Sequence, residues 1–289
     1  MIRAALICCA AALMVVGVAG ATASSVSYPD PAGDAGKYPD IVRVDVLEDQ
    51  TFSGPHLTFW ATFSATQPCG DSGGPPVVFA LDLDQNPDTG SAFYGAEAEL
   101  TRDQYGSPLL LRSIGWDFAA ASPQPDSGFG AGCGPDGAGF DLHRSDLGLA
   151  PGAGFNVVAV VASPHTDSAP DMGTFNYPGA GSPPSLGPDK RAPHIASVFP
   201  ARAVHGKLAR LTYWTLDGRG RTAETIRVYR RNRVIATIRR PLGETNPFDL
   251  THVSWRVPGN VRGKLRFSVV SLDAAGNRSS VRWGQLSVR

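Results

Sequence analysis

LDLDQNPDTGSAFYGAEAEL, residues 81–100, predicts a strand, an acidic turn and a second strand. Side chains alternate between the two faces of a strand, so the leucines are expected to face a core while Asp82 and Asp84 share the outer face. Glu97 and Glu99 repeat this arrangement after the turn. If the two strands pair, their carboxylates lie close together. Such a cluster must be either well solvated or bound to a cation.

Alternating apolar and polar residues recur through the rest of the first half. In residues 57–63, Leu57 and Phe59 are expected to face the core and Trp60 the opposite side. Further strands are expected at 41–47, 77–84, 96–102, 109–118, 140–143 and 155–162, separated by segments rich in Gly, Pro, Ser and Asp. No long window keeps a helical period. The pattern predicts an all-β sandwich.

The second half repeats this pattern with the opposite charge. Short strands are expected at 195–199, 209–216, 225–229, 234–238, 251–256, 265–272 and 282–288, which is typical of an immunoglobulin-type sandwich. Residues 24–188 contain 20 acidic and 5 basic residues, a net charge of −15, whereas residues 189–289 contain 6 and 20, a net charge of +14. Two β-sandwich domains of opposite charge are therefore expected.

Four segments follow from these shifts in composition. Residues 1–23 are expected to be a cleaved signal peptide, because an apolar run leads to the small residues Ala21 and Ala23. The acidic sandwich then occupies 24–178, a Pro/Gly-rich linker 179–193, and the basic Ig-like sandwich 194–289. No other run is long and apolar enough to span a membrane. The mature chain is expected to be secreted, with association with the cell surface left open.

The first half resembles the DOMON-like and family-9 carbohydrate-binding-module-like β-sandwiches of secreted bacterial proteins. The resemblance rests on the lead-in DPAGD at 30–34, on the strand-turn-strand at 81–100, on SDLG at 145–148 and on DSAPDMGTFNY at 167–177. The second half resembles bacterial Ig-like and fibronectin-III-like accessory domains through DAAGN at 273–277. These resemblances imply binding of sugars, surface polymers or proteins, or a role as spacers. They do not imply catalysis.

The acidic turn is a candidate calcium site. Oxygen-bearing side chains recur at every second position, as in other oxygen-ligand loops for calcium, and a further carboxylate follows on the second strand; the predicted ligands are Asp82, Asp84, Asn86, Asp88 and Glu97. Aspartates of the lead-in and the closing segment could add ligands: Asp30, Asp34, Asp40, Asp167 and Asp171. The alternative is a solvated turn, since Asn, Asp and Gly favour turns without a metal. Any calcium is expected to be structural, and no other cofactor is expected.

Aromatic and basic side chains mark two further candidate surfaces. Sugar rings stack on flat aromatic faces, so Trp60, Tyr94 and Trp116 are candidate ligand contacts, although most aromatic residues of a sandwich belong to its core. Arg230, Arg231 and Arg233 gather on one predicted hairpin, which indicates either a solvated strand face or a site for an anionic envelope polymer. Nucleic acid is not an expected partner of an exported chain.

No sequence motif indicates an active site. The chain lacks a Gly-x-Ser-x-Gly elbow, a His-Glu-x-x-His helix and a phosphate-binding glycine loop. The expected function is that of a secreted, non-enzymatic protein binding carbohydrate or envelope polymer. The alternatives are a spacer or protein-interaction protein without a small ligand, and an accessory part of an extracellular hydrolase system. The sequence does not indicate an oligomeric state.

Cys69 and Cys133 are expected to form a disulfide, because they are the two cysteines that remain once the signal peptide is removed. Closing this loop would stabilise the fold by about 4 kcal/mol in the chain-entropy model. Intact mass before and after reduction and alkylation checks the pairing. Alkylation of the untreated, folded chain at either cysteine would contradict it.

Overall fold

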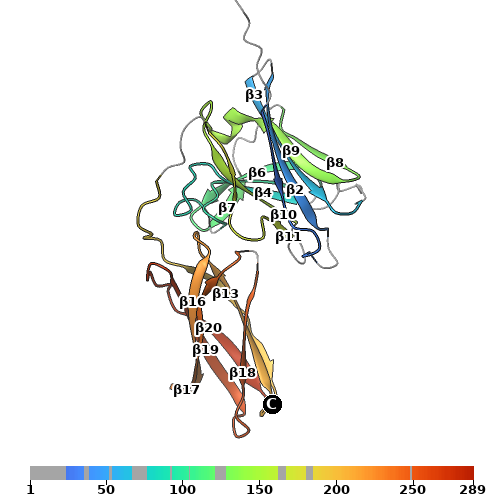
Figure 1. Ribbon diagram of the computed structural model, residues 1–289. Helices are drawn as coiled ribbons and strands as arrows, with labels where there is room; N and C mark the ends of the chain where they lie inside the picture. The colour runs from blue at the N-terminus through green and yellow to red at the C-terminus, as the bar shows by residue number, and fades with distance from the viewer. Residues whose placement is uncertain are drawn as a thin grey trace, which may run out of the picture.

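The structure is a computed structural model that describes residues 24–35, 39–51, 54–66, 77–91, 93–103, 105–120, 128–161, 167–179, 185–247 and 249–289. Within these residues nearly all regular structure is β, and the single helical element is the 3₁₀ turn η1, Arg144–Leu147. The prediction of an all-β fold is confirmed. Figure 1 shows the two halves of the chain as two β-layered units joined end to end.

The first half of the chain forms two antiparallel sheets. One has the order β1-β2-β3-β9-β8, made of β1 (Ser24–Pro29), β2 (Ile41–Thr51), β3 (Gly54–Phe63), β9 (Gly137–His143) and β8 (Gly130–Gly134). The other has the order β11-β10-β4-β5-β6-β7, made of β11 (Asp167–Ala169), β10 (Phe155–Val161), β4 (Val77–Asp82), β5 (Ala98–Arg102), β6 (Pro108–Ile114) and β7 (Asp117–Ala120), with β12 (Phe175–Tyr177) also paired to β10.

Alternation along β3 and β4 explains how the N-terminal core forms. Leu57 and Phe59 are fully buried on β3, and Phe79 and Leu81 are fully buried on β4. The Phe59 and Phe79 rings lie 5.7 Å apart between their centroids, so the inner faces of the two sheets meet there. Trp60 lies on the opposite face of β3, as the alternation predicts.

The second half forms a three-stranded and a five-stranded sheet. The first has the order β13-β15-β18, made of β13 (His194–Val198), β15 (Leu208–Leu216) and β18 (Thr251–Arg256). The second has the order β14-β20-β19-β16-β17, made of β14 (Ala201–Ala203), β20 (Arg282–Val288), β19 (Gly263–Asp273), β16 (Arg221–Arg230) and β17 (Arg233–Glu244). All seven predicted strands are present, and β14 was not predicted. A separate core lies between these sheets around Tyr213, Ile226 and Phe267.

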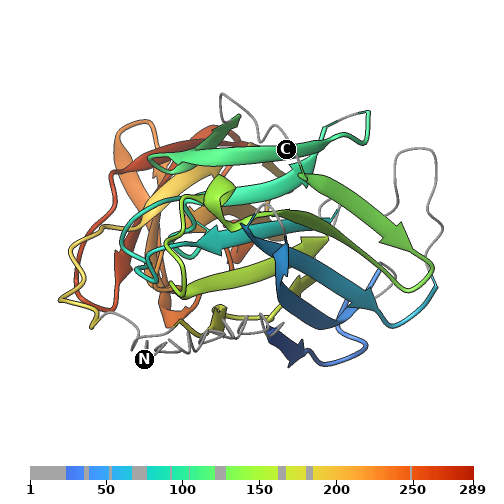
Figure 2. The ribbon, with the colours of Figure 1, turned by 90° about the horizontal axis from the view of Figure 1, so that it is seen from above.

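The two halves touch at one end of each sandwich, at a contact here called the seam. Figure 2 views it from above, with the blue-to-green strands of the first half lying over the orange and red strands of the second. Arg219 donates two hydrogen bonds to Asp88, from Nε at 2.9 Å and from Nη2 at 2.6 Å. Gly218 lies so close to the first half that a Cβ there would be 1.9 Å from the carbonyl oxygen of Pro87.

Arg191 completes the seam from the segment that leads into β13. Its guanidinium donates a hydrogen bond to the carbonyl oxygen of Gly90 at 2.7 Å and lies 3.7 Å above the ring of Trp116. Residues 185–193, which the sequence assigns to the linker, contain no strand or helix, yet they contact the first half through this side chain. Among the described residues, no helix is long and apolar enough to cross a membrane.

The seam predicts a measurable dependence of domain arrangement on its two arginines. We expect Arg191→Ala combined with Arg219→Ala to broaden the interdomain distances measured by small-angle scattering, because the substitutions remove a bidentate ion pair and a cation–π contact, each about 1 kcal/mol. The matched control is Arg221→Ala, whose ion pair with Glu244 at 3.4 Å is exposed and lies within the second half. If the scattering curve of the double variant matches that of the wild type, these two arginines do not fix the arrangement of the sandwiches.

Candidate functional site

The acidic turn brings three of its five predicted ligands together. Asp82 ends β4, Asp84 follows it, and Glu97 directly precedes β5. One carboxylate oxygen from each residue lies within 4.8 Å of the others. The turn forms because β4 and β5 pair with Leu81 opposite Ala98, which closes the loop between them.

Protein donors already satisfy these carboxylates. Asp82 accepts hydrogen bonds from the Asn86 backbone and the Asn156 side chain, both at 2.9 Å. Glu97 accepts from the Leu83 backbone at 2.7 Å and from the Thr89 hydroxyl at 2.9 Å. Internal hydrogen bonds therefore hold the turn in place.

The outer face at this turn is solvated at Asp84 but not at Asp82, which corrects the expectation from strand alternation in part. Asp82 is only 2% exposed, and Tyr94 folds over the same face of the sheet to pack on Val78, Val158 and Val160. Burial raises the pKa of Asp82 to about 7, and the charges of Glu97 and Asp84 act in the same direction. Burial also raises the pKa of Glu97.

The other two predicted ligands point elsewhere. Asp88 is paired with Arg219 across the seam. Asn86 uses its side-chain oxygen to accept a hydrogen bond from the Asp88 backbone at 3.1 Å. Asp88 is therefore used by the seam and Asn86 by the local turn, while Asp82, Asp84 and Glu97 remain together, and calcium at the turn stays a prediction. A cleft of about 520 Å³ remains beside the turn, lined by Asp82, Asn156 and Arg219 among others.

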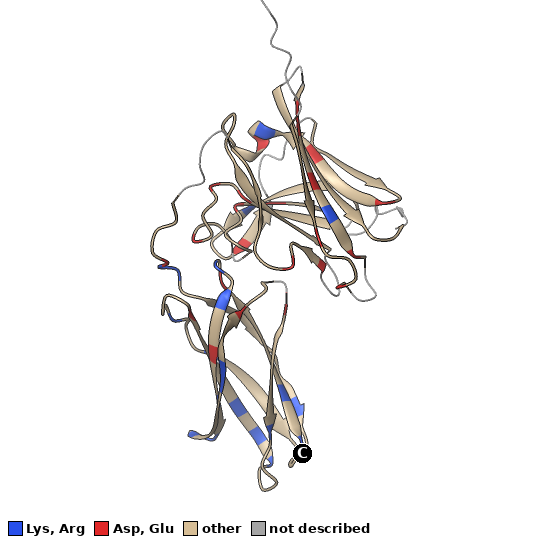
Figure 3. Cartoon of the chain, in the orientation of Figure 1, with Lys and Arg blue, Asp and Glu red and all other residues tan. Residues whose placement is uncertain are grey.

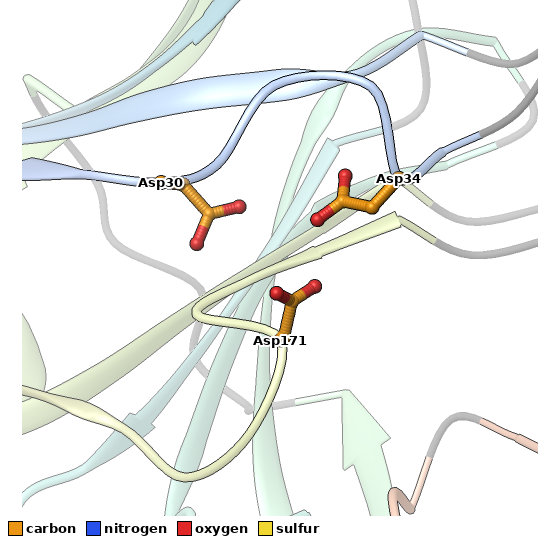
Figure 4. Close-up of side chains that lie close together, drawn as sticks. All are labelled: Asp30, Asp34 and Asp171. Atoms are coloured by element: carbon orange, nitrogen blue, oxygen red, sulfur yellow. The ribbon is translucent and has the colours of Figure 1, made fainter.

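A second carboxylate cluster lies at the opposite end of the β4–β10 pair. Oxygens of Asp30, Asp34 and Asp171 lie within 4.8 Å of one another, and so do oxygens of Asp34, Asp40 and Asp167. Figure 4 shows the carboxylates of Asp30, Asp34 and Asp171 converging from the loop after β1 and the loop after β11. We call these five residues the lead-in cluster. These residues, predicted as additional ligands for the turn, form a group separate from it.

The electrostatics of the lead-in cluster differ from those of the turn. Burial, with the negative charges of Asp171 and Asp167, raises the pKa of Asp30 to about 7. Burial and hydrogen bonding to Asp171 and Asp40 raise the pKa of Asp34 to about 6. Burial raises the pKa of Asp167 as well. Asp30 Oδ2 is buried without a hydrogen-bond partner among the described residues, so this cluster holds more negative charge than its donors satisfy.

Asp40 behaves differently within the lead-in cluster. Burial acts to raise its pKa, but hydrogen bonds from Ser64 and from the Gly33 backbone outweigh burial and lower it. The Gly33 amide lies 3.0 Å from Asp40 Oδ2. Asp40 is therefore the member that stays ionised most readily. Five oxygen-donor residues with one firmly ionised member suit a hard divalent cation such as calcium, which takes six to eight oxygen ligands.

Trp60 occupies the centre of the outer face of the β1-β2-β3-β9-β8 sheet. It stands opposite Gly139 on β9, and Gly139 stands opposite Gly132 on β8. A Cβ at Gly137 would lie 2.3 Å from Trp60 Nε1, and one at Gly139 would lie 2.9 Å from its Cε3. The glycines thus leave room for the indole to lie against the backbone of the neighbouring strands, on the outer face of the sheet.

Polar side chains adjoin Trp60 on this face. Asp45 stands opposite Trp60 on β2 and accepts hydrogen bonds from the Ser27 hydroxyl and from Arg43 Nε, the latter at 2.8 Å. Arg43 also donates to the Thr62 hydroxyl at 3.2 Å. An aromatic ring flanked by fixed carboxylate, guanidinium and hydroxyl groups can stack on a sugar ring and hydrogen-bond its hydroxyls.

The other two predicted aromatic contacts belong to different environments. Tyr94 is only 5% exposed and packs on Val158 and Val160, at the wall of the cleft beside the turn. Trp116 is covered by the Arg191 guanidinium and stacks with His194 at 5.3 Å between ring centroids. The seam therefore uses Trp116. Alternation along the strand could not reveal that Trp116 is covered, since Arg191 and His194 both come from the second half.

The remaining predicted residues fall on two edges of the molecule. Cys133 lies on β8, whereas Cys69 lies outside the described residues, so their disulfide stays a prediction. Arg230, Arg231 and Arg233 surround the β16–β17 turn, where Arg231 adopts a φ of 56°. Figure 3 shows Lys and Arg gathered over the second half and Asp and Glu over the first.

Sequence reasoning missed one exposed aromatic group in the second half. Trp283 on β20 is 48% exposed, and its ring lies 5.1 Å from that of Tyr229 on β16. Arg266 on β19 lies over both rings. The alternation of residues 282–288 could have revealed it. Trp283, Gln285 and Ser287 lie on the exposed face of this strand, and Leu286 lies on the buried face.

Comparison with known proteins gives only distant structural similarity. No protein-family model matches the chain, and no curated protein matches it. The fibronectin(III)-like modules of Clostridium thermocellum CbhA match at 14% identity over 81% of this chain and 85% of theirs, with a TM-score of 0.24. The titin domains Z1Z2 in complex with telethonin match at 12% identity over 81% and 88%, with a TM-score of 0.23. Scores this low carry no argument about function.

The lead-in cluster predicts opposite effects of pH with and without calcium. The pKa values of Asp30 and Asp34 are higher in the folded chain than the ordinary carboxyl value, so the folded state binds more protons than the unfolded state between about pH 4 and pH 7. With chelator present, we expect the thermal stability of the first half to fall as pH rises through this window. Calcium requires the ionised carboxylates, so it should restore stability near pH 7 and have little effect near pH 5.

Two matched substitutions separate the lead-in cluster from the turn. Asp171→Asn should abolish the calcium response, which in the wild type reaches about 2.7 kcal/mol at a hundred times Kd. Asp84→Asn, in the turn, should leave the response intact. The measurement is a pair of melting curves for each variant, with calcium and with chelator. A response that survives Asp171→Asn but disappears in Asp84→Asn would assign the cation to the turn instead.

Proposed function

We propose that this chain is an exported, non-enzymatic binding protein whose first half binds carbohydrate on the outer face of the β1-β2-β3-β9-β8 sheet. The observation that carries the proposal is the position of Trp60, which lies over glycines on the outer face with polar groups at its edge. Packing of the hydrophobic core does not explain glycine at these positions, because the positions face outward. The missing side chains do leave space for a flat aromatic ring on the outer face.

The resemblance of residues 28–178 to DOMON-like and family-9 carbohydrate-binding-module-like sandwiches supports the same proposal. In such a module, calcium at the lead-in cluster would be structural. It would join the loop after β1 to the loop after β11 and so fix the edge of the sandwich. The cluster lies at the start of β2, where the Ile41 amide donates a hydrogen bond to Asp167, whereas Trp60 pairs with Asp45 further along that strand.

Retention on an anionic envelope polymer is a second proposed role, assigned to the second half. Its support is the position of Arg230, Arg231 and Arg233, which surround the hairpin turn at the end of the second half away from the seam (Figures 1 and 3). Exposed ion pairs between two domains contribute little individually, whereas a dense polyanion presents many charges at once. The rival role is that of a spacer or protein-interaction protein, in which neither surface binds a polymer.

Trp60→Ala is expected to weaken binding of neutral polysaccharide about tenfold or more, because it removes the stacking platform. The measurement is a glycan array followed by affinity electrophoresis in the glycans that bind. Trp60→Phe keeps a ring over the glycines and should retain part of the affinity. Trp283→Ala, which alters an exposed tryptophan of the other sandwich, is the matched control and should leave binding unchanged.

Two results would count against the carbohydrate proposal. If the wild-type chain binds no polysaccharide, the spacer or protein-interaction role is left. If Trp60→Ala binds as tightly as the wild type, the sugar site lies elsewhere. A melting curve of each variant shows whether a loss of binding comes from unfolding, which matters because Trp60 is half-buried.

A further inference from the structure

The outer face of the five-stranded sheet in the second half carries aromatic and cationic side chains in register. One row across the strands runs Arg227, Ser268, Trp283, and the next runs Tyr229, Arg266, Gln285. Residues directly opposite each other on paired strands point to the same face. The buried residues Ile226, Val228, Phe267 and Leu286 alternate with them and face the core. Trp283, Tyr229 and Arg266 are therefore brought together on the outer surface.

The Trp283 side chain stays 48% exposed although the Arg266 guanidinium lies over its ring. The Arg266 guanidinium lies 4.5 Å from the Trp283 ring centroid and 5.7 Å from that of Tyr229. The two rings are tilted by 52° against each other, so they do not form a continuous stack. Arg266 also donates a hydrogen bond to Asn232 in the hairpin turn at 3.2 Å. The guanidinium is thus held in place beside an indole that is half exposed.

Cations extend this surface along the sheet. Arg239 stands in the row next to Arg227, and Lys264 precedes Arg266 on β19. Within the described rows from Thr225 to Tyr229 there is no acidic side chain on this face. The nearest acid along β17 on the same face, Glu244, lies at the seam end and pairs with Arg221. The face therefore carries uncompensated positive charge.

Shallow hollows connect the face with the basic hairpin. One of about 380 Å³ is lined by Arg231, Asn232, Lys264, Arg266 and Gln285 among others, and another of about 660 Å³ by Arg230, Arg231, Asn232 and Arg233 together with Ile235. They share Arg231 and Asn232. A polymer lying along the hairpin would therefore continue onto the sheet beside Trp283.

We propose that this face binds an acidic polysaccharide, with a sugar ring stacked on Trp283 and the carboxylates of neighbouring residues paired with Arg266, Lys264 and the hairpin arginines. The proposal rests on the second role proposed above, retention on an anionic polymer, and specifies its chemistry. A polymer of uronic acids supplies both features that the face complements, a ring and a charge on each residue. A ringless polyanion supplies the charge alone. Single-stranded nucleic acid would require several successive stacking platforms, and this face offers one.

The test compares three polymers on the full chain from residue 24: polygalacturonate, polyphosphate and single-stranded DNA. We expect Trp283→Ala to weaken binding to polygalacturonate about tenfold and binding to polyphosphate less than about twofold, since only the first polymer has rings to stack. Trp283→Tyr should keep most of the affinity. Replacing Arg230, Arg231 and Arg233 together by Ser should weaken binding to both polymers and reduce its dependence on salt. Tyr105→Ala, which removes an exposed aromatic side chain outside both proposed surfaces, is the matched control and should change neither.

The outcomes separate this inference from the role on which it rests. If the hairpin variant loses binding while Trp283→Ala does not, the retention role stands and sugar stacking at Trp283 is wrong. If the wild-type chain binds neither anionic polymer, both are wrong. Binding of single-stranded DNA that is as tight as that of polygalacturonate and equally sensitive to Trp283→Ala would also overturn the inference. Melting curves of the Trp283 variants should match the wild type, because the side chain is half exposed.

Discussion

The pairing of β4 with β10 determines where the acidic residues of the first half act. Asp82 stands opposite Asn156 at one end of this ladder, and Val77 stands opposite Val161 at the other. Since Val161 also pairs with Asp167 on β11, the same two strands carry a carboxylate group at each end. One end meets arginines of the second half. At the other end, the described residues pair no basic side chain with the carboxylates, which is why cation binding is better suited to the lead-in cluster than to the turn.

The two halves carry large opposite net charges, but few of these charges pair with each other across the seam. Across the seam, one arginine forms a bidentate pair with Asp88, while Arg191 binds carbonyl groups and an aromatic ring. Most of the remaining basic residues lie elsewhere on the second half (Figure 3). Charge complementarity between the halves therefore cannot explain the asymmetry by itself. A role for the basic surface outside the chain is the simpler explanation.

The sequence predicted the architecture better than the site, for a physical reason. Period-two alternation records which face of a strand is apolar, so the inward residues of β3 and seven of the eight strands of the second half could be predicted. Alternation does not record what covers the outward face. Tyr94 packs on Val158 and Val160, and Arg191 lies over Trp116, and both contacts join residues distant in sequence. The lead-in cluster was visible residue by residue, but only the fold shows that its members form a group of their own.

Salt distinguishes the two kinds of arginine contact in this chain. Screening weakens interactions between exposed charges beyond about 8 Å at physiological ionic strength, and it acts far less on short contacts that are partly buried. Arg191 lies against neutral carbonyl groups and the Trp116 ring, so salt has little charge to screen there. In the proposed complex the hairpin arginines would act on a polymer through exposed charge alone, and Arg266 would add a contact beside an aromatic ring. Rising salt should therefore release the polymer from the hairpin first, while the arrangement of the two sandwiches persists.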